Sequence, residues 1–282
     1  MPSVALPANY TFVALHATGS HGVIMRAVGP DGSPCAIKAA NPGWHFPPAL
    51  FRREVDIQSS LRIHGVIPVL DRWSGEAGEA MALPWLPCKL SGRGPLKPAV
   101  AVDILVKLAN TLQSLHAEGV VHRDITPDNI LFSSPDSLEP WLGDFGLAVR
   151  MGETEVPAVR PTPGFVLTNP ADAWDTRQDT HGLAASVWSA ISGGGPPPLN
   201  RSCKALMAQA RMAGNPVPER VARQFSRWLR RPPSAISMVR EAEQLKIEAN
   251  HAPQRLHGIP RFFSKLFRYF MKWFQKPDNR HS

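Results

Sequence analysis

The chain has 282 residues, 43% of them hydrophobic, and a formal net charge of +8. This length and composition suit a globular protein with one large domain or with two lobes that share a cleft. The charge is uneven, because residues 251–282 carry seven Lys or Arg against one acid and therefore +6, which leaves +2 for the rest. The basic character belongs mainly to a tail, and we expect no binding of nucleic acid.

Cysteine usage and the start of the chain bear on the cellular compartment. The three cysteines are far apart and form no CxxC pair: Cys35, Cys88 and Cys203. Such a set argues against a disulfide framework and a structural zinc site, and it suits a reducing cytosol. The first residues lack the pattern of a signal peptide, and no run of about 18 apolar residues predicts a spanning helix. We therefore expect a cytoplasmic protein.

The predicted elements of the first part are mostly strands. Residues 10–40 have the pattern of three strands, separated by a glycine-containing turn and by a GPDG turn. Residues 48–63 have the pattern of a helix. Strand-like pieces follow around 66–74 and 79–85.

From residue 98 onward the pattern is mainly helical. Apolar residues recur there at helical spacing until Gly119, which predicts a long buried helix with a glycine cap. The stretches 156–170 and 193–198 are rich in Pro or Gly and are predicted loops. Further helices are predicted at 179–192, 200–213, 217–230 and 234–250.

Two motifs follow the long helix. Residues 122–129 read HRDITPDN, and residues 144–146 read DFG. In these segments the sequence resembles the protein kinase family, with its catalytic loop H-R-D-x-x-x-x-N and its metal-binding D-F-G. Upstream, residues 35–38 read CAIK and resemble the V-A-I-K strand, and Glu54 stands where the family has the glutamate of its helix αC. The order and spacing of these motifs favour an eukaryotic-like, Hanks-type serine/threonine kinase. The richness in Ala, Pro and Arg is compatible with a bacterial source.

The resemblance covers about residues 10–245 and implies an α+β, two-lobed protein-kinase fold. We expect a kinase domain at 10–248, with a small β-rich N-lobe at about 10–86 and a larger helical C-lobe at about 87–248. A linker at 249–259 and a basic amphipathic helix at 260–277 are predicted to follow.

The resemblance also implies the chemistry of the site. Phosphoryl transfer depends on positioning and on charge stabilisation, so the family needs only a few charged groups. Asp124 would accept the proton of the substrate hydroxyl. Asn129 and Asp144 would hold Mg²⁺, and Lys38 would contact the phosphates of ATP and pair with Glu54.

A glycine-containing loop ahead of Lys38 is expected to cover the phosphates. Residues 17–24 read ATGSHGVI, where the family has G-x-G-x-x-G-x-V. Ile24 stands at the position of the usual Val. An alanine thus replaces the first glycine, which we expect to weaken ATP binding mildly. In addition to the residues named above, the resemblance implies that six positions contact the nucleotide: Ala17, Gly19, Gly22, Ile24, Ala36 and Leu83.

Two departures from the family pattern predict a divergent enzyme with modest turnover. Thr126 stands where serine/threonine kinases usually have Lys, which removes a positive charge near the γ-phosphate. The A-P-E motif is missing after the TPGF segment at 162–165, although that segment resembles the family's substrate-docking sequence. Asp179 matches the aspartate that braces the catalytic loop in the family.

The sequence leaves rival functions open. The main hypothesis is an ATP-dependent kinase of protein Ser/Thr hydroxyls, including its own. One alternative is a pseudokinase or scaffold that binds nucleotide without transfer, and another is a small-molecule kinase on the same fold. Arg123 beside the catalytic aspartate is of the type that often holds an activation-loop phosphate, for which Thr154 is the candidate site.

The tail carries a separate pattern. The five basic residues within 260–277 fall within a stripe of about 80° on a helix of 100° per residue, with aromatic residues opposite. This pattern favours binding to an anionic membrane surface, which would hold the protein peripherally at the inner membrane face. Packing on the kinase body and docking in a partner's groove stay open as alternatives. The stripe consists of Arg261, Lys265, Arg268, Lys272 and Lys276.

Overall fold

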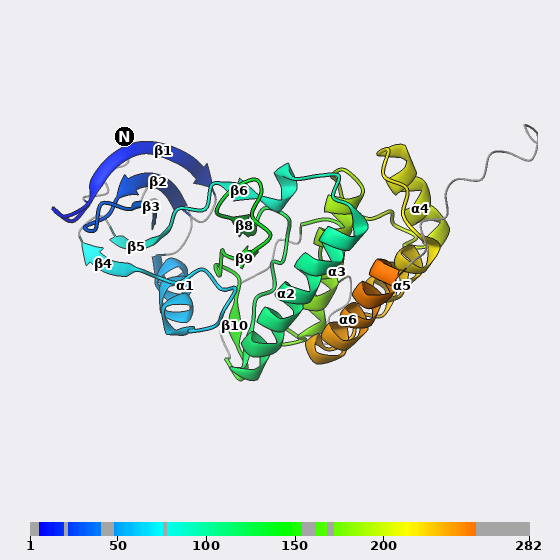
Figure 1. Ribbon diagram of the computed structural model, residues 1–282. Helices are drawn as coiled ribbons and strands as arrows, with labels where there is room; N and C mark the ends of the chain where they lie inside the picture. Colours follow the sequence, from blue (N-terminus) through cyan, green and yellow to red (C-terminus); the bar gives the residue numbers. More distant parts are fainter. Residues whose placement is uncertain are drawn as a thin grey trace, which may run out of the picture. The chain divides into compact units, whose positions relative to one another are not determined.

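The computed structural model describes residues 6–19, 22–40, 48–75, 78–153, 162–167 and 172–251 (Figure 1). The chain divides into two compact units, Met1–Ala249 and Asn250–Ser282. Almost all described residues belong to the first unit.

The first part of this unit is a five-stranded antiparallel sheet with the strand order β1-β2-β3-β5-β4. In β2 the side chains of Val23, Met25 and Ala27 are buried at every second position, as expected for a strand with one face on a core. The three strands predicted within residues 10–40 are confirmed. The strands are β1 (Thr11–Gly19), β2 (Gly22–Val28), β3 (Pro34–Ala39), β4 (Asp71–Gly75) and β5 (Gly78–Pro84).

The strand expected at about 66–74 is wrong in its first half, because β4 begins only at Asp71. Val66 instead forms an isolated parallel bridge with Leu142. The backbone N–H of Ile67 donates to the carbonyl of Leu142, and the N–H of Leu142 donates to the carbonyl of Gly65. These hydrogen bonds tie the segment to the second part of the unit rather than to the sheet.

One helix, α1 (Pro48–Ser60), lies between β3 and β4 in the chain and packs against β5 (Figure 1). Its buried Phe51 and Val55 contact Met81 of β5 in a small apolar cluster. Helix α1 ends three residues earlier than the pattern predicted. The Gln58 side chain, one turn before the predicted end, donates to the carbonyl of Ile67.

The second part is mainly helical, as predicted, and its centre is α3. Thirteen of the fifteen α3 residues are buried, because α2 packs on one side of it and α5 on another. Trp188 of α3 forms an aromatic cluster with Phe225 and Trp228 of α5. The helices are α2 (Pro98–Ala117), α3 (Arg177–Ile191), α4 (Cys203–Met212), α5 (Glu219–Arg230) and α6 (Ala235–His251), preceded by the 3₁₀ turn η1 (Leu90–Gly92).

Short strands between α2 and α3 position the two motif loops. Strand β7 pairs with β10, and β8 pairs with both β6 and β9. The 122–129 segment therefore runs from β7 to β8, and the 144–146 segment runs from β9 to β10. The strands are β6 (Cys88–Lys89), β7 (Val120–Val121), β8 (Ile130–Phe132), β9 (Trp141–Leu142) and β10 (Val149–Arg150).

The architecture is the α+β, two-lobed one expected, with a sheet and one helix followed by a helical region (Figure 1). Among the helices that the structure describes, none is both long and apolar enough to cross a membrane. The helix predicted at 260–277 lies outside the described residues, and so does most of the loop predicted at 156–170.

A histidine in the core makes the stability of this unit depend on pH. His181 of α3 is fully buried. Burial, together with the nearby positive charge of Arg201, lowers the pKa of His181 to about 4. The unfolded chain therefore takes up a proton at about pH 6.5, where the folded protein does not.

We predict that the free energy of unfolding falls as the pH is lowered from about 6.5 to about 4, with His181 contributing about 2 kcal/mol of that fall. In His181→Leu the free energy of unfolding should change less with pH between about 4 and 6.5, as measured by urea unfolding at a series of pH values. His16→Gln, at an exposed histidine of β1, is the matched control and should keep the wild-type slope. An unchanged slope in His181→Leu contradicts the prediction.

Candidate active site

A buried ammonium group joins the sheet, helix α1 and the D-F-G segment. Lys38 of β3 forms an ion pair with Glu54 of α1, and its Nζ lies 2.9 Å from Oδ1 of Asp144. The side chains of Lys38 and Glu54 are 8% and 0% exposed, whereas that of Asp144 is 35% exposed. The structure thus brings together three of the charged residues predicted from sequence, which are 16 and 106 positions apart.

The charges at this junction do not cancel, since two carboxylates surround one ammonium. Burial acts against the ammonium, but the carboxylates of Asp144 and Glu54 outweigh it and raise the pKa of Lys38. Burial, aided by the charge of Asp144, raises the pKa of Glu54 to about 7, even though Lys38 acts in the opposite direction. A group with positive charge bound near Asp144 would relieve this excess of negative charge.

The catalytic-loop residues are connected by the amide of Asn129. Its Nδ2 donates to the backbone carbonyl and to Oδ2 of Asp124, both at 2.9 Å. The backbone of Asn129 is itself held, because its N–H donates to the carbonyl of Thr126 and its carbonyl accepts from the N–H of Gly143. The Asp124 carboxylate is therefore oriented by a residue that is fixed to the D-F-G side of the site.

The carboxylate of Asp179 holds the backbone at the start of this loop. It accepts the N–H groups of His122 and Arg123 at 2.9 and 2.7 Å, and its Oδ2 lies 2.8 Å from Nε2 of His116. Burial would raise the pKa of Asp179, but the hydrogen bond and charge of His116 and the contacts with His122 keep it below its usual range. Asp179 stays ionised, so it can stabilise Arg123 at φ +69°, a conformation that is rare outside glycine.

The D-F-G segment is held from the catalytic loop as well. Nε2 of His122 lies 3.0 Å from the carbonyl oxygen of Gly143, and the rings of His122 and Phe145 are 4.6 Å apart. Asp144 has φ +62°. This left-handed conformation is sparsely populated for aspartate, and such strain is concentrated at functional sites.

The predicted nucleotide positions share one face of the sheet. Ile24 is directly opposite Lys38, and Ala36 is opposite Leu83. Since Ala36 and Lys38 are two residues apart on β3, all four side chains point to the same side. Ala17 is opposite Ile24 and extends this face to β1.

The glycines of the predicted phosphate-covering loop flank a tight connection. Gly19 at the end of β1 is opposite Gly22 at the start of β2, and residues 20–21 lie outside the described part. Gly22 has φ +146°, and a Cβ there would lie 2.3 Å from the carbonyl oxygen of Ala39. Only glycine fits at this position, because the backbone of Ala39 occupies the space that a side chain would need.

An aromatic side chain lies just beyond β5. Trp85 contacts the ring of His16 edge to face at 4.9 Å, and the guanidinium of Arg26 lies 5.3 Å from its centroid. Trp85 thus connects the segment after β5 to β1 and β2. No motif in the sequence predicts this contact.

The donor atoms fit a magnesium ion held together with phosphates. Among the described residues there is no group of three or more His, Cys, Asp or Glu that could bind a metal by itself. Asp144 and Asn129 offer oxygen donors, and Mg²⁺ typically takes one or two protein oxygens and completes its shell with phosphates and waters. This set therefore fits an ion that arrives with a nucleotide.

No sequence motif predicted a role for Arg53 of α1 or Arg150 of β10. Arg53, adjacent to Glu54, forms an ion pair with Glu153, and Arg150 donates to the hydroxyl of Ser60. No motif marks these residues, because their partners are 100 and 90 positions away. The candidate phosphosite Thr154 lies outside the described residues.

Residues 12–240 match the family model "Protein kinase domain". Since the match covers most of the chain, the chain belongs to the protein kinase family. It is 24% identical over 185 residues to the serine/threonine-protein kinase PknB of Mycobacterium tuberculosis, and 25% identical over 184 residues to that of Mycobacterium leprae. It is 28% identical over 180 residues to the serine/threonine-protein kinase PknH of Mycobacterium bovis. These alignments cover 60% of this chain and 29% of each relative.

We predict that Asp179→Asn lowers the free energy of unfolding by about 3 kcal/mol, because the amide removes a buried charge that pairs with three donors. Urea unfolding followed by circular dichroism measures this loss. Asp136→Asn, at an exposed loop position, is the matched control and should stay within about 0.5 kcal/mol of wild type. Equal stability of the two variants contradicts a bracing role for Asp179.

Proposed function

We propose that this chain is an ATP-dependent protein serine/threonine kinase, which transfers the γ-phosphoryl group of ATP-Mg to protein hydroxyls, including its own. The observation that carries this proposal is the junction of Lys38 with both Glu54 and Asp144, beside a catalytic-loop carboxylate held by Asn129. Membership of the protein kinase family and similarity to serine/threonine kinases support the same function.

In the proposed reaction the hydroxyl oxygen of a Ser or Thr attacks the γ-phosphorus of ATP. A bond forms between these two atoms, and the bond from the γ-phosphorus to the β–γ bridging oxygen breaks, so that ADP leaves. The proton of the hydroxyl passes to the Asp124 carboxylate. Because Asn129 already orients this carboxylate, Asp124 can also direct the hydroxyl oxygen toward the phosphorus.

Lys38 is proposed to contact the α- and β-phosphates. Its ammonium is held charged by Glu54 and Asp144, so a phosphate meets a fixed positive charge that needs little reorganisation. The face formed by Ala17, Ile24, Ala36 and Leu83 is proposed to contact the nucleotide, with Gly19 and Gly22 bringing backbone close to the phosphates.

Asp144 and Asn129 are proposed to hold Mg²⁺. The ion would neutralise phosphate charge during transfer. It would also add positive charge beside Asp144, where two carboxylates surround the single ammonium of Lys38. The partly exposed position of Asp144 suits a residue that must reach an ion brought by ATP.

The absence of a lysine at position 126 favours modest turnover. Thr126 is buried, and its carbonyl accepts the N–H of Asn129, so it supports the loop backbone. Its hydroxyl cannot supply the positive charge that lysine brings near the γ-phosphate. A scaffold without transfer and a small-molecule kinase are the rival functions, and the TPGF segment at 162–165 favours protein acceptors over small molecules.

The proposal is tested by incubating the protein with γ-labelled ATP, Mg²⁺ and myelin basic protein or casein. Label should appear on Ser and Thr of the protein acceptor, fall at least about 100-fold in Asp124→Ala, and disappear when EDTA removes Mg²⁺. Binding of ATP without transfer to any acceptor contradicts the proposal and leaves the scaffold. Label confined to aminoglycosides or other small hydroxyl compounds would favour the small-molecule kinase instead.

We further propose that residues 260–277 bind an anionic membrane surface and place the protein on the inner face of a membrane. The proposal is supported by the narrow stripe of five cations opposite aromatic residues. The wild-type chain should co-sediment with vesicles that contain phosphatidylglycerol and much less with neutral vesicles. A truncation at residue 254 should lose this binding and keep kinase activity, whereas equal binding by both proteins rules out a membrane role for the tail.

A further inference from the structure

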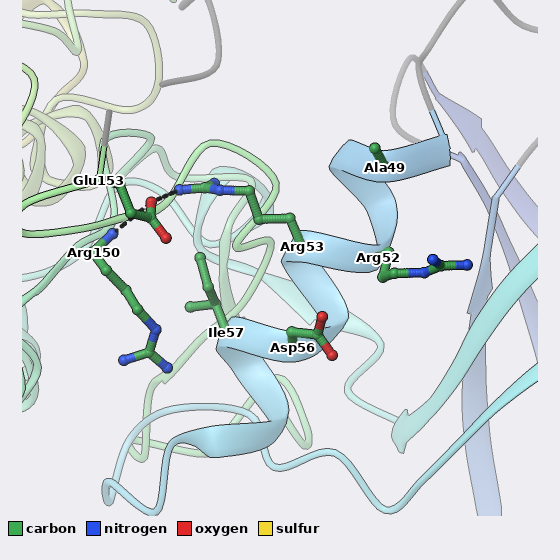
Figure 2. Close-up of a pocket in the computed structure, with 7 residues that line it drawn as sticks. All are labelled: Ala49, Arg52, Arg53, Asp56, Ile57, Arg150 and Glu153. Atoms are coloured by element: carbon green, nitrogen blue, oxygen red, sulfur yellow. Dashed lines mark hydrogen bonds and ion pairs between the residues drawn. The ribbon is translucent and has the colours of Figure 1, made fainter. Parts of the chain in front are cut away.

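Two adjacent charged residues of α1, Arg53 and Glu54, contact different parts of the structure. Glu54 forms an ion pair with Lys38. Arg53 forms an ion pair with Glu153 (Figure 2) and also donates to the carbonyl oxygen of Ala148. Ala148 and Glu153 lie on either side of β10, which follows the D-F-G segment. A single side chain of α1 therefore holds both ends of the strand that leaves the metal-binding aspartate.

Glu153 is fixed in this position by a second hydrogen bond. Its Oε2 accepts the backbone N–H of Arg150 at 3.0 Å, and Figure 2 shows its carboxylate between Arg53 and that N–H. The Arg150 side chain extends to Ser60 at the end of α1. Arg53, Arg150 and Glu153 line a hollow of about 350 Å³ between α1 and β10.

Positive charges lie on both sides of this hollow, with Arg52 and Arg53 on α1 and Arg150 on β10. Burial and the positive charge of Arg53 lower the pKa of Arg123, although Asp179 acts in the opposite direction. The side chain of Arg53 is 18% exposed and that of Glu153 is 30% exposed, so solvent screens the pair only in part. Glu153 supplies a negative charge at the place where α1 and β10 bring arginines together.

Anchoring at Arg53 bears directly on Glu54. The two residues are adjacent on one helix, so the position of the Arg53 backbone fixes that of Glu54. The other strong contact of this stretch, between Arg52 and Glu79, ties α1 to the sheet and not to β10. Arg53 thus links the middle of α1 to both ends of β10, beside the contact of Glu54 with the backbone of Phe145.

We propose that Glu153 is a positioning residue of the active site: by binding Arg53 it holds α1 so that Glu54 pairs with Lys38 without any phosphate group added to the chain. The inference rests on the proposed kinase function and deepens it, since it assigns the assembly of the Lys38–Glu54 pair to an internal carboxylate.

The test uses the full-length chain, freed of phosphate by a phosphatase and checked by mass spectrometry. The dephosphorylated wild type should phosphorylate a generic acceptor protein in its first turnovers. Glu153→Gln should lower kcat about ten-fold, with the KM for the acceptor protein unchanged, because it removes one charge-assisted hydrogen bond that holds α1 and positions Glu54. Glu153→Asp should recover part of the rate. Glu219→Gln, at an exposed pair on α5, is the matched control and should keep full activity.

A double-mutant cycle separates positioning from general destabilisation. Arg53→Gln should lower kcat to a similar extent, and the double variant should lose little more than either single variant. Thermal melting of each variant shows that the assays are run on folded protein. Hydrogen exchange of α1 should rise in Glu153→Gln at a temperature at which the rest of the fold stays protected.

The outcomes distinguish the two proposals. An inactive wild type, whatever its phosphate content, overturns the kinase function and this inference with it. A wild type that is active only when phosphorylated overturns the inference alone. Full activity of Glu153→Gln, or strictly additive losses in the double variant, also overturns it and leaves the kinase function standing.

Discussion

The structure depends on one buried ammonium that three separate elements share. Lys38 is on the sheet, Glu54 is on α1 and Asp144 follows β9, so the ion pairs of a single side chain fix the relation of all three. Burying such charges is unfavourable unless they are paired, and here one ammonium is paired with two carboxylates. The site is therefore balanced for a ligand that brings positive charge to Asp144 and negative charge to Lys38.

A second buried charge, that of Asp179, organises the opposite side of the site. Its carboxylate holds the backbone of His122 and Arg123, and His122 in turn contacts the D-F-G segment. The catalytic loop is thus held by α3, the most buried of the described helices, and contacts the D-F-G segment through His122. Rigid support from the core explains how strained backbone at Arg123 and Asp144 persists.

Much of the fold could be predicted from sequence, because strands and helices are specified by local periodicity. The order of the motifs also predicted which charged residues meet, although 106 positions separate Lys38 from Asp144. Prediction was wrong where a distant contact decides the local structure, as at Val66, whose bridge to Leu142 replaces the start of a strand. The Arg53–Glu153 pair escaped prediction for the same reason, since neither residue belongs to a motif that fixes its partner.

The contact of Arg53 with the carbonyl of Ala148 also has a pharmacological meaning. An inhibitor that needs the D-F-G segment turned outward would have to break the contact of Lys38 with Asp144, and the Arg53 contact resists movement of the chain just beyond it. Compounds that bind with the D-F-G segment turned inward need no such rearrangement of the protein. The preference of the protein for one inhibitor type over the other would then depend on Arg53, a side chain that neither type of compound touches.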